Sequence, residues 1–428
     1  MTKTEALAKI RENHLNENFK QNLPLFINSI FENRNNILKS FLTSINETFT
    51  KAADMQKDNL KEDIALINIS IIRSDAIFNK FNYRIDAFNE KWYGDKVECC
   101  VYWNADFLFK LLQEAMEQVF PRFKDYPHIL YPYDLQTLKM MEIVKYHIFA
   151  VEAISAMIKQ ATELESFNKM QKINEFKIVV GEYMDASKIV YPFPKEDEKG
   201  IDTFVFEHIF SDFTHNASHT PRTSMKEPDF APPSQLSNNS FTLKHRNGSV
   251  AVNYFVLSQD SRVVAPRIKY EYMKKYSKAI HFTYQIAKVM PEMNVFQVLS
   301  DELTDFTDVL SEQLFLVSAD MGKLFQLFDP ELKLKTAVMF NRKIGHHTYK
   351  MPLFREVDCL SEETEFYPDN RTIKTLVLKY EKIKKRKIFK VRDRDIVIIR
   401  MDVAESILRR CFTGIHLEPV AVTETADV

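Results

Sequence analysis

Apolar residues recur every three to four positions along two long stretches of the chain. Between Pro24 and about Ala52 they form a stripe along one side of an α-helix, and proline is tolerated in a helix's first turn. A second helix is predicted from Asp134 to about Lys172. The middle of this second helix is apolar nearly all round, so we expect it to lie inside a domain or against a partner.

Other segments alternate between apolar and polar residues, which is typical of β-strands. The alternation predicts strands within 65–72, 80–88, 175–183, 249–258, 331–340 and 372–400. Two further helices are predicted at Arg267–Met290, which is basic, and at Asn294–Val317, which is acidic. Because only a short connection at Pro291 separates them, they are expected to form an antiparallel helical hairpin.

The apolar pattern breaks down between Thr214 and Ser240, where Ser, Thr, Asn and Pro dominate. Such composition is typical of a linker or a long exposed loop. The sequence therefore predicts an α+β fold with two domains. The N-terminal domain (1–195) is helix-rich, residues 196–235 hold a helix end and a linker, and the C-terminal domain (236–428) combines the helical hairpin with an antiparallel sheet. We find no internal repeat in the sequence.

Composition narrows the class of protein. The chain has 428 residues, 45% of them hydrophobic, and a net charge of −1, so no overall field favours nucleic acid or an anionic membrane. Four cysteines suit a reducing compartment. The most apolar long run, Met140–Ile158, carries three charged residues and indicates a buried helix rather than a membrane span. We expect a soluble, cytoplasmic protein.

Glycine is scarce, with seven residues standing singly along the chain. Phosphate-binding loops, dinucleotide fingerprints and nucleophile elbows depend on glycine, because the backbone must approach a ligand closely or adopt positive φ. The sequence therefore disfavours P-loop NTPases, Rossmann dehydrogenases, protein kinases and α/β-hydrolases, and it implies no cofactor.

The segment Glu207–His219 offers a candidate metal site. If it is helical, His208, Asp212, His215 and His219 project from one face at spacings of four, three and four residues. Imidazole and carboxylate groups one turn apart can bind zinc or iron. However, no catalytic Glu lies between these ligands and no second ligand-bearing helix is evident. We therefore favour the polar face of a helix end, and we expect no bound metal.

The densest charge run is Lys379–Arg394, with nine basic residues and two acidic ones. Interleaved Tyr380 and Phe389 are compatible with a surface that binds phosphates and stacks bases. The alternative is a solvated hairpin tip. Upstream, Glu356–Asp369 has six acidic residues and no basic one, so the two segments either neutralise each other or face different partners. The candidates for binding nucleic acid or a protein partner are Lys382, Lys384, Lys385, Arg386, Lys387 and Lys390.

Cys99 and Cys100 lie in an apolar, strand-like run, which indicates buried structural thiols rather than nucleophiles. No catalytic constellation stands out. The sequence therefore favours a non-catalytic structural or interaction protein, a subunit of a larger intracellular assembly that binds protein partners or itself. The alternative is a metal-dependent or nucleic-acid-processing enzyme that uses the His208–His219 face and the basic run.

Overall fold

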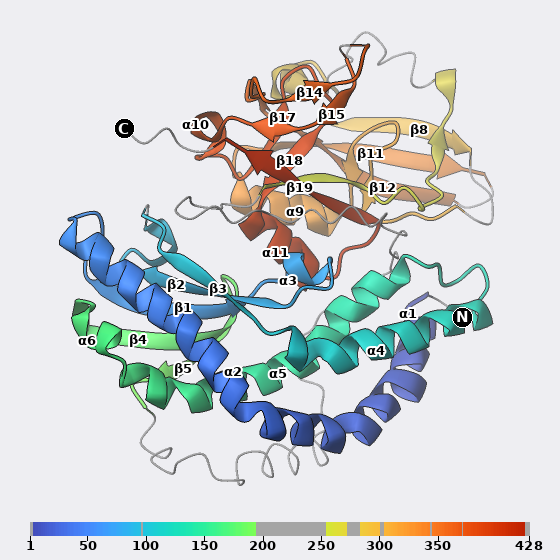
Figure 1. The fold of residues 1–428 in the computed structure, drawn as a ribbon. Coiled ribbons are helices and arrows are strands. Elements are labelled where there is room, and N and C mark those ends of the chain that lie inside the picture. Colours follow the sequence, from blue (N-terminus) through green and yellow to red (C-terminus); the bar gives the residue numbers. More distant parts are fainter. Residues whose placement is uncertain are drawn as a thin grey trace. The chain divides into compact units, whose positions relative to one another are not determined.

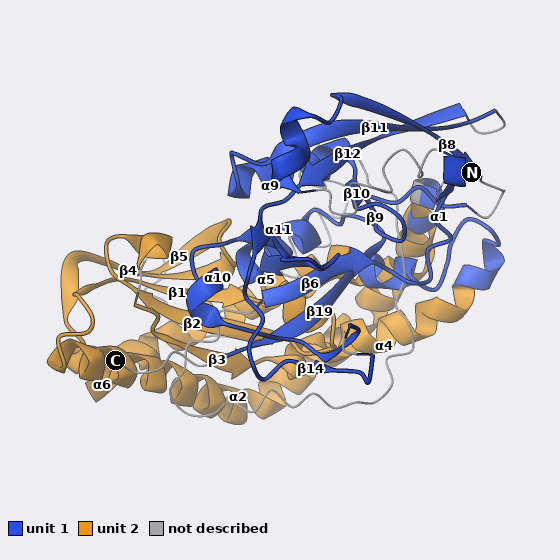
Figure 2. Cartoon of the chain, turned by 90° about the horizontal axis from the view of Figure 1, so that it is seen from above, with its two compact units in different colours: residues 1–7, 123–138, 228–428 blue, residues 8–122, 139–227 orange. Residues whose placement is uncertain are grey.

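The computed structural model describes residues 3–95, 97–193, 254–271, 283–299, 304–342, 345–369 and 371–423. Long helices and several sheets make the fold α+β, which confirms the predicted class (Figure 1). The chain divides into two compact units: unit 1 comprises residues 1–7, 123–138 and 228–428, and unit 2 comprises residues 8–122 and 139–227 (Figure 2). The predicted linker, 196–235, lies outside the described residues, and the predicted domain boundaries stay a prediction.

Unit 2 combines long helices with one five-stranded sheet. Its helical elements, two of which begin in unit 1, are α1 (Lys3–Ile10), the π-helix η1 (Arg11–Asn16), α2 (Glu17–Lys57), α3 (Arg73–Ala76), η2 (Trp92–Gly94), η3 (Asp106–Phe109), α4 (Lys110–Val119), η4 (Phe120–Asp125, which ends in unit 1), α5 (Asp134–Thr162) and α6 (Glu165–Lys169). Its strands are β1 (Ile64–Ile71), β2 (Asn82–Phe88), β3 (Cys100–Asn104), β4 (Lys172–Glu182) and β5 (Ser187–Tyr191).

The five strands follow the order β3-β2-β1-β4-β5, in which β1 and β4 are parallel and the other neighbours antiparallel. One face of the sheet is apolar and packs on helices. Trp103 of β3 contacts Phe41 of α2, with ring centroids 5.3 Å apart, and Tyr83 of β2 contacts His147 of α5. The opposite face carries polar residues because strand side chains alternate. It is this polar face that positions one of the candidate sites.

Helix α2 begins earlier than its sequence pattern predicts. The predicted start at Pro24 is wrong, because the helix begins at Glu17 and Pro24 lies inside it. The buried stripe continues upstream of the proline with Phe19 and Leu23, so packing holds the helix together despite the missing N–H. The predicted helix from Asp134 is present, but it ends at Thr162, and the short helix α6 follows.

Unit 1 contains two six-stranded sheets and one hairpin. Its helical elements are η5 (Tyr284–Lys288), α9 (Ala319–Phe328), α10 (Tyr380–Ile383) and α11 (Met401–Arg409). Its strands are β6 (Tyr254–Gln259), β7 (Arg267–Ile268), β8 (Met293–Leu299), β9 (Val309–Leu310), β10 (Leu316–Val317), β11 (Lys333–Asn341), β12 (Gly345–Leu353), β13 (Glu356–Val357), β14 (Glu365–Phe366), β15 (Ile373–Thr375), β16 (Val377–Leu378), β17 (Ile388–Val391), β18 (Val397–Arg400) and β19 (Ile415–Val422).

The two large sheets repeat one topology, although the sequence shows no repeat. Their orders are β7-β8-β11-β12-β10-β9 and β13-β17-β18-β6-β19-β16. Strand β8 runs parallel to β11 in the first sheet, as β16 runs parallel to β19 in the second. Strands β9 and β10 are antiparallel, and so are β17 and β18. Helix α9 connects β10 to β11, and α11 connects β18 to β19 in the same way. Residues 254–341 and 345–422 are therefore two copies of one arrangement.

The two copies exchange a strand. The first strand of each copy, β6 or β12, lies in the middle of the sheet built by the other copy and is antiparallel to both neighbours there. Strand β12 then continues into β13, which pairs with β17 at the edge of the second sheet. Each sheet thus depends on a strand from the other copy. We expect the two sheets to fold together, because removing a central strand breaks two strand pairings.

The predicted helical hairpin over 267–317 is wrong in its described part. Residues 293–299 form the strand β8, and their burial alternates, with Asn294, Phe296 and Val298 inside. Downstream, β9 and β10 replace the rest of the predicted second helix. Residues 272–282 and 300–303 lie outside the described part. The opposite charges of the two segments suggested facing helices, but the burial of residues 293–299 alternates with a period of two, which is the pattern of a strand.

Lys3 is held by a charged cluster in unit 1. The Nζ of Lys3 lies 2.7 Å from a carboxylate oxygen of Asp305 and 3.4 Å from Asp134. The hydroxyl of Tyr133 donates to Asp305 over 2.6 Å. Burial and the charge of Asp305 raise the pKa of Tyr133 far above its usual value. These contacts explain why residues 1–7 and 123–138 belong to unit 1.

Candidate functional site

The candidate metal site of the sequence analysis is not among the described residues. His208, Asp212, His215 and His219 lie outside the described residues, so the absence of a metal there stays a prediction. His347, a histidine of unit 1, is described and partly buried. Its ring stacks on Phe306 with centroids 3.7 Å apart, and burial lowers its pKa. His347 is therefore a packing residue in unit 1.

The adjacent cysteines behave as the sequence predicts. Cys99 is buried, and Cys100, at the start of β3, is partly buried. Burial raises the pKa of Cys99 to about 11 and raises that of Cys100 further. A thiol that stays protonated at neutral pH is a poor nucleophile. Both residues are thus structural.

Cys100 belongs to a largely buried polar cluster on the polar face of the unit 2 sheet. Asp86 of β2 lies directly opposite Cys100 of β3, and Glu98 lies two residues earlier on the same side. One ligand-type atom from each of the three lies within 4.8 Å of the others, a spacing that suits a metal ion. The sequence analysis missed this cluster. Its signal is the spacing of two in Arg84-x-Asp86 and Glu98-x-Cys100 within apolar strands.

Arg84 already occupies this cluster. Its Nε lies 2.8 and 2.9 Å from the two carboxylate oxygens of Asp86, and its guanidinium also pairs with Glu98. Although burial opposes the charge on Arg84, the two carboxylates outweigh it and raise the pKa of the guanidinium. A metal ion would have to displace this cation. The geometry therefore fits a buried ion-pair network better than a metal centre.

The basic run lies on α10, the following turn and β17. Lys382, Lys384, Lys385 and Arg386 are exposed, whereas Lys387 is half-buried and Lys390 is buried. Lys384 pairs with Glu381, Lys387 lies 3.4 Å from Asp402, and Lys390 lies 2.6 Å from Asp395. Within the described part of the chain, Lys382, Lys385 and Arg386 have no acidic partner. These three residues are named the basic turn.

The acidic and basic segments partly neutralise each other. Strand β13 of the acidic segment runs parallel to β17 of the basic one. Arg392 lies 3.0 Å from Asp358, and Lys379 pairs with Glu362. Because both pairs are exposed to solvent, they contribute little to stability. Their importance is that they remove both ends of the basic run from binding and leave the basic turn.

Phe389, one of the two aromatic residues of the basic run, cannot stack on bases. Phe389 is completely buried and packs against Tyr254, with centroids 6.3 Å apart, in the core of the second large sheet. Stacking on single-stranded nucleic acid needs exposed rings. Phe389 therefore does not supply the exposed ring that the nucleic-acid alternative needs.

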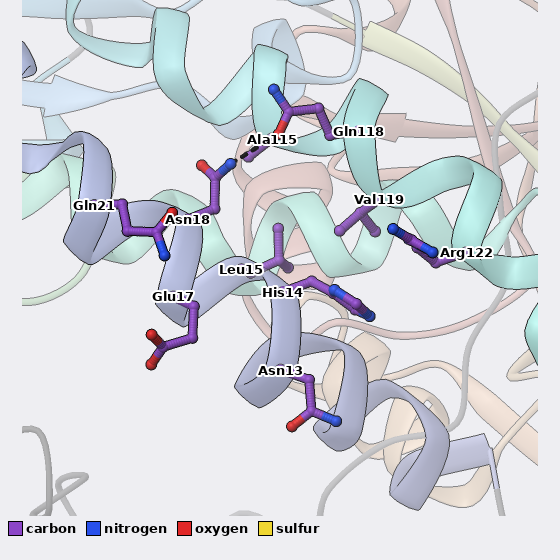
Figure 3. A pocket seen from close by; sticks show the side chains of 10 residues that line it. All are labelled: Asn13, His14, Leu15, Glu17, Asn18, Gln21, Ala115, Gln118, Val119 and Arg122. Atoms are coloured by element: carbon purple, nitrogen blue, oxygen red, sulfur yellow. Dashed lines mark hydrogen bonds between the residues drawn. The ribbon is translucent and has the colours of Figure 1, made fainter.

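A groove of about 260 Å³ lies between α4 and the junction of the π-helix with α2 (Figure 3). Its floor is apolar and buried, formed by Leu15, Ala115 and Val119. Polar side chains form its rim: Asn13, His14, Glu17, Asn18, Gln21, Gln118 and Arg122. The sequence analysis did not find this groove, because its two walls are about a hundred residues apart in the chain.

The sequence matches no protein-family model and no curated protein. In the described part of the chain, no helix has the length and apolar character needed to cross a membrane.

Proposed function

We propose that the protein is a non-catalytic subunit that binds an acidic protein partner through the basic turn. The observation that carries this proposal is the set of three exposed, unpaired cations, Lys382, Lys385 and Arg386, on a chain whose net charge is only −1. A local patch of one sign steers a partner of the opposite sign and fixes its orientation.

Exposed apolar side chains support a protein partner rather than nucleic acid. On the outward face of β8, Met293, Val295 and Leu299 are 63%, 47% and 57% exposed. Protein interfaces combine apolar surface with a polar rim, whereas phosphate backbones reward positive charge alone. The buried Phe389 also weighs against the nucleic-acid alternative.

The described interior groups support a non-catalytic role. The thiols of Cys99 and Cys100 stay protonated, and Arg84 neutralises the nearby carboxylates. A nucleophile or general base needs a pKa near the working pH and access to substrate. These groups instead hold the sheet together.

A charge-reversal experiment tests the proposal. The variant Lys382→Glu/Lys385→Glu/Arg386→Glu is compared with Lys20→Glu/Lys57→Glu/Lys323→Glu, which changes net charge equally at three exposed, locally paired lysines. In sedimentation of the full chain with its partners retained, the first variant should lose the partner and the control should keep it.

High salt should also release the partner, since exposed charges are screened. Equal retention by both variants, or a chain that sediments alone at all salt concentrations, would contradict the proposal. Release by nuclease treatment would favour the nucleic-acid alternative.

A further inference from the structure

Two side chains of basic residues, Arg122 and His14, line the groove between α4 and the π-helix without a partner in the described part of the chain. Arg122 is exposed and His14 is half-buried. Within the described part of the chain, neither side chain makes a hydrogen bond or an ion pair. Glu17 is the one acidic residue on the rim, and its carboxylate lies 3.2 Å from Lys20 and points away from the groove (Figure 3). The groove is therefore suited to an anion.

The π-helix explains why His14 lines the groove. Residues five apart lie on one side of a π-helix, because its hydrogen bonds join i and i+5. Arg11 and Asn16 are five apart, and both reach α5: Arg11 lies 2.8 Å from Glu142, and Asn16 accepts from Lys145 over 2.6 Å. Glu142 is buried, so this anchor is firm. The anchor fixes the rotation of the segment and leaves Asn13 and His14 on the groove side.

Amide groups complete the rim. The Nδ2 of Asn18 donates to the Oε1 of Gln118 over 2.8 Å and so joins the two walls of the groove (Figure 3). Within the described part of the chain, this contact leaves the amide N–H groups of Gln118 and the amide of Gln21 without a protein partner. The groove thus offers a guanidinium, an imidazole and amides above an apolar floor. Its volume of about 260 Å³ suits a ligand of a few heavy atoms.

We propose that this groove binds a small aliphatic carboxylate, held by Arg122 and His14 with its chain against Leu15, Ala115 and Val119. A guanidinium matches the planar carboxylate with two parallel hydrogen bonds. The apolar floor favours a short hydrocarbon chain over inorganic phosphate, which has no apolar part to bury. This site lies in unit 2 and is independent of the basic turn in unit 1.

Histidine side-chain NMR on the full chain tests the site. Butyrate, acetate and inorganic phosphate are the probes, with sodium chloride at equal ionic strength as reference, and His14→Gln assigns the His14 signal. Butyrate should shift that signal saturably, with a dissociation constant on the order of a millimolar. Acetate should bind about fifteenfold more weakly, because it lacks two methylenes and each buried methylene contributes roughly fourfold.

The variant Arg122→Gln should weaken butyrate binding at least tenfold, whereas Arg34→Gln, at an exposed arginine outside the groove, should not change it. Thermal unfolding confirms that both variants fold. A His14 signal that follows ionic strength alone, or unchanged binding by Arg122→Gln, would overturn the site. Tighter binding of phosphate than of butyrate would overturn the assignment to a carboxylate. Each of these results leaves the test of the basic turn unaffected.

Discussion

The hydroxyl of Tyr83 lies 2.7 Å from Nδ1 of His147, and the two rings stack with their centroids 5.7 Å apart. Tyr83 stands in the middle of the unit 2 sheet and His147 on α5, so the pair joins the sheet to the helix that covers it. Both side chains are buried. Burial lowers the pKa of His147 to about 4, so the imidazole is neutral at pH 7 and its Nδ1 shares one hydrogen bond with the hydroxyl of Tyr83.

This pair predicts a specific pH dependence of stability. Between about pH 4 and 6.5 the unfolded chain protonates His147 and the folded chain does not, so stability falls as the pH falls through this window. The full effect is about 3 kcal/mol, from a shift of about two and a half pH units. The measurement is denaturant unfolding of the wild type at several pH values in this window.

The double variant Tyr83→Phe/His147→Phe is the control for this prediction. It removes both hydrogen-bonding partners and keeps the ring stack, which avoids an orphaned polar group. Its stability should change less with pH than that of the wild type, by about 3 kcal/mol across the window. Parallel pH profiles for the two proteins would show that His147 titrates in the folded state as it does in the unfolded chain.

Gly414 should not tolerate a side chain. Its φ is +68°, and an added Cβ would lie 2.2 Å from the hydroxyl oxygen of Thr307. Gly414→Ala should therefore cost about 3 kcal/mol or more, from backbone strain plus the clash. The matched control is Gly345→Ala, where φ is +81° but no described residue comes within 4 Å of the added Cβ, so backbone strain alone should cost about 1 kcal/mol. Thermal unfolding gives both values, and equal costs would contradict the close approach of Thr307.

Removing Arg84 should destabilise unit 2 strongly. Arg84→Ala leaves the buried carboxylate of Asp86 without its partner, which costs about 3–5 kcal/mol. The exposed pair of Arg392 and Asp358 provides the comparison, and Arg392→Ala should cost less than about 1 kcal/mol.

The double variant Arg84→Ala/Asp86→Ala tests whether Arg84 and Asp86 stabilise the fold as an ion pair or as two independent side chains. It should lose less stability than the sum of the two single variants, because it leaves one fewer unpaired charge inside the sheet. Strict additivity in denaturant unfolding would argue against the ion pair.

Local sequence patterns determined much of the secondary structure. The alternation in 65–72 and 80–88 marks the strands β1 and β2, and the stripe around Phe41 and Ile45 marks the helix α2. These signals are reliable because a sheet or helix that buries one face repeats its apolar residues at the period of the backbone. Phe389 shows the limit of such patterns. Its neighbours in sequence are basic, yet β18 and β6 enclose it in the core.

Only the tertiary structure decided which distant residues meet. The sequence could not show that β6 and β12 exchange places between two sheets, because strand pairing depends on backbone hydrogen bonds that every residue type except proline can make. It could not bring His14 to Arg122, since their distance depends on how α4 packs against the π-helix. Burial decided the chemistry of Cys100 and His147. A residue's pKa and reactivity follow from what surrounds it in space, and the order of residues along the chain does not contain that information.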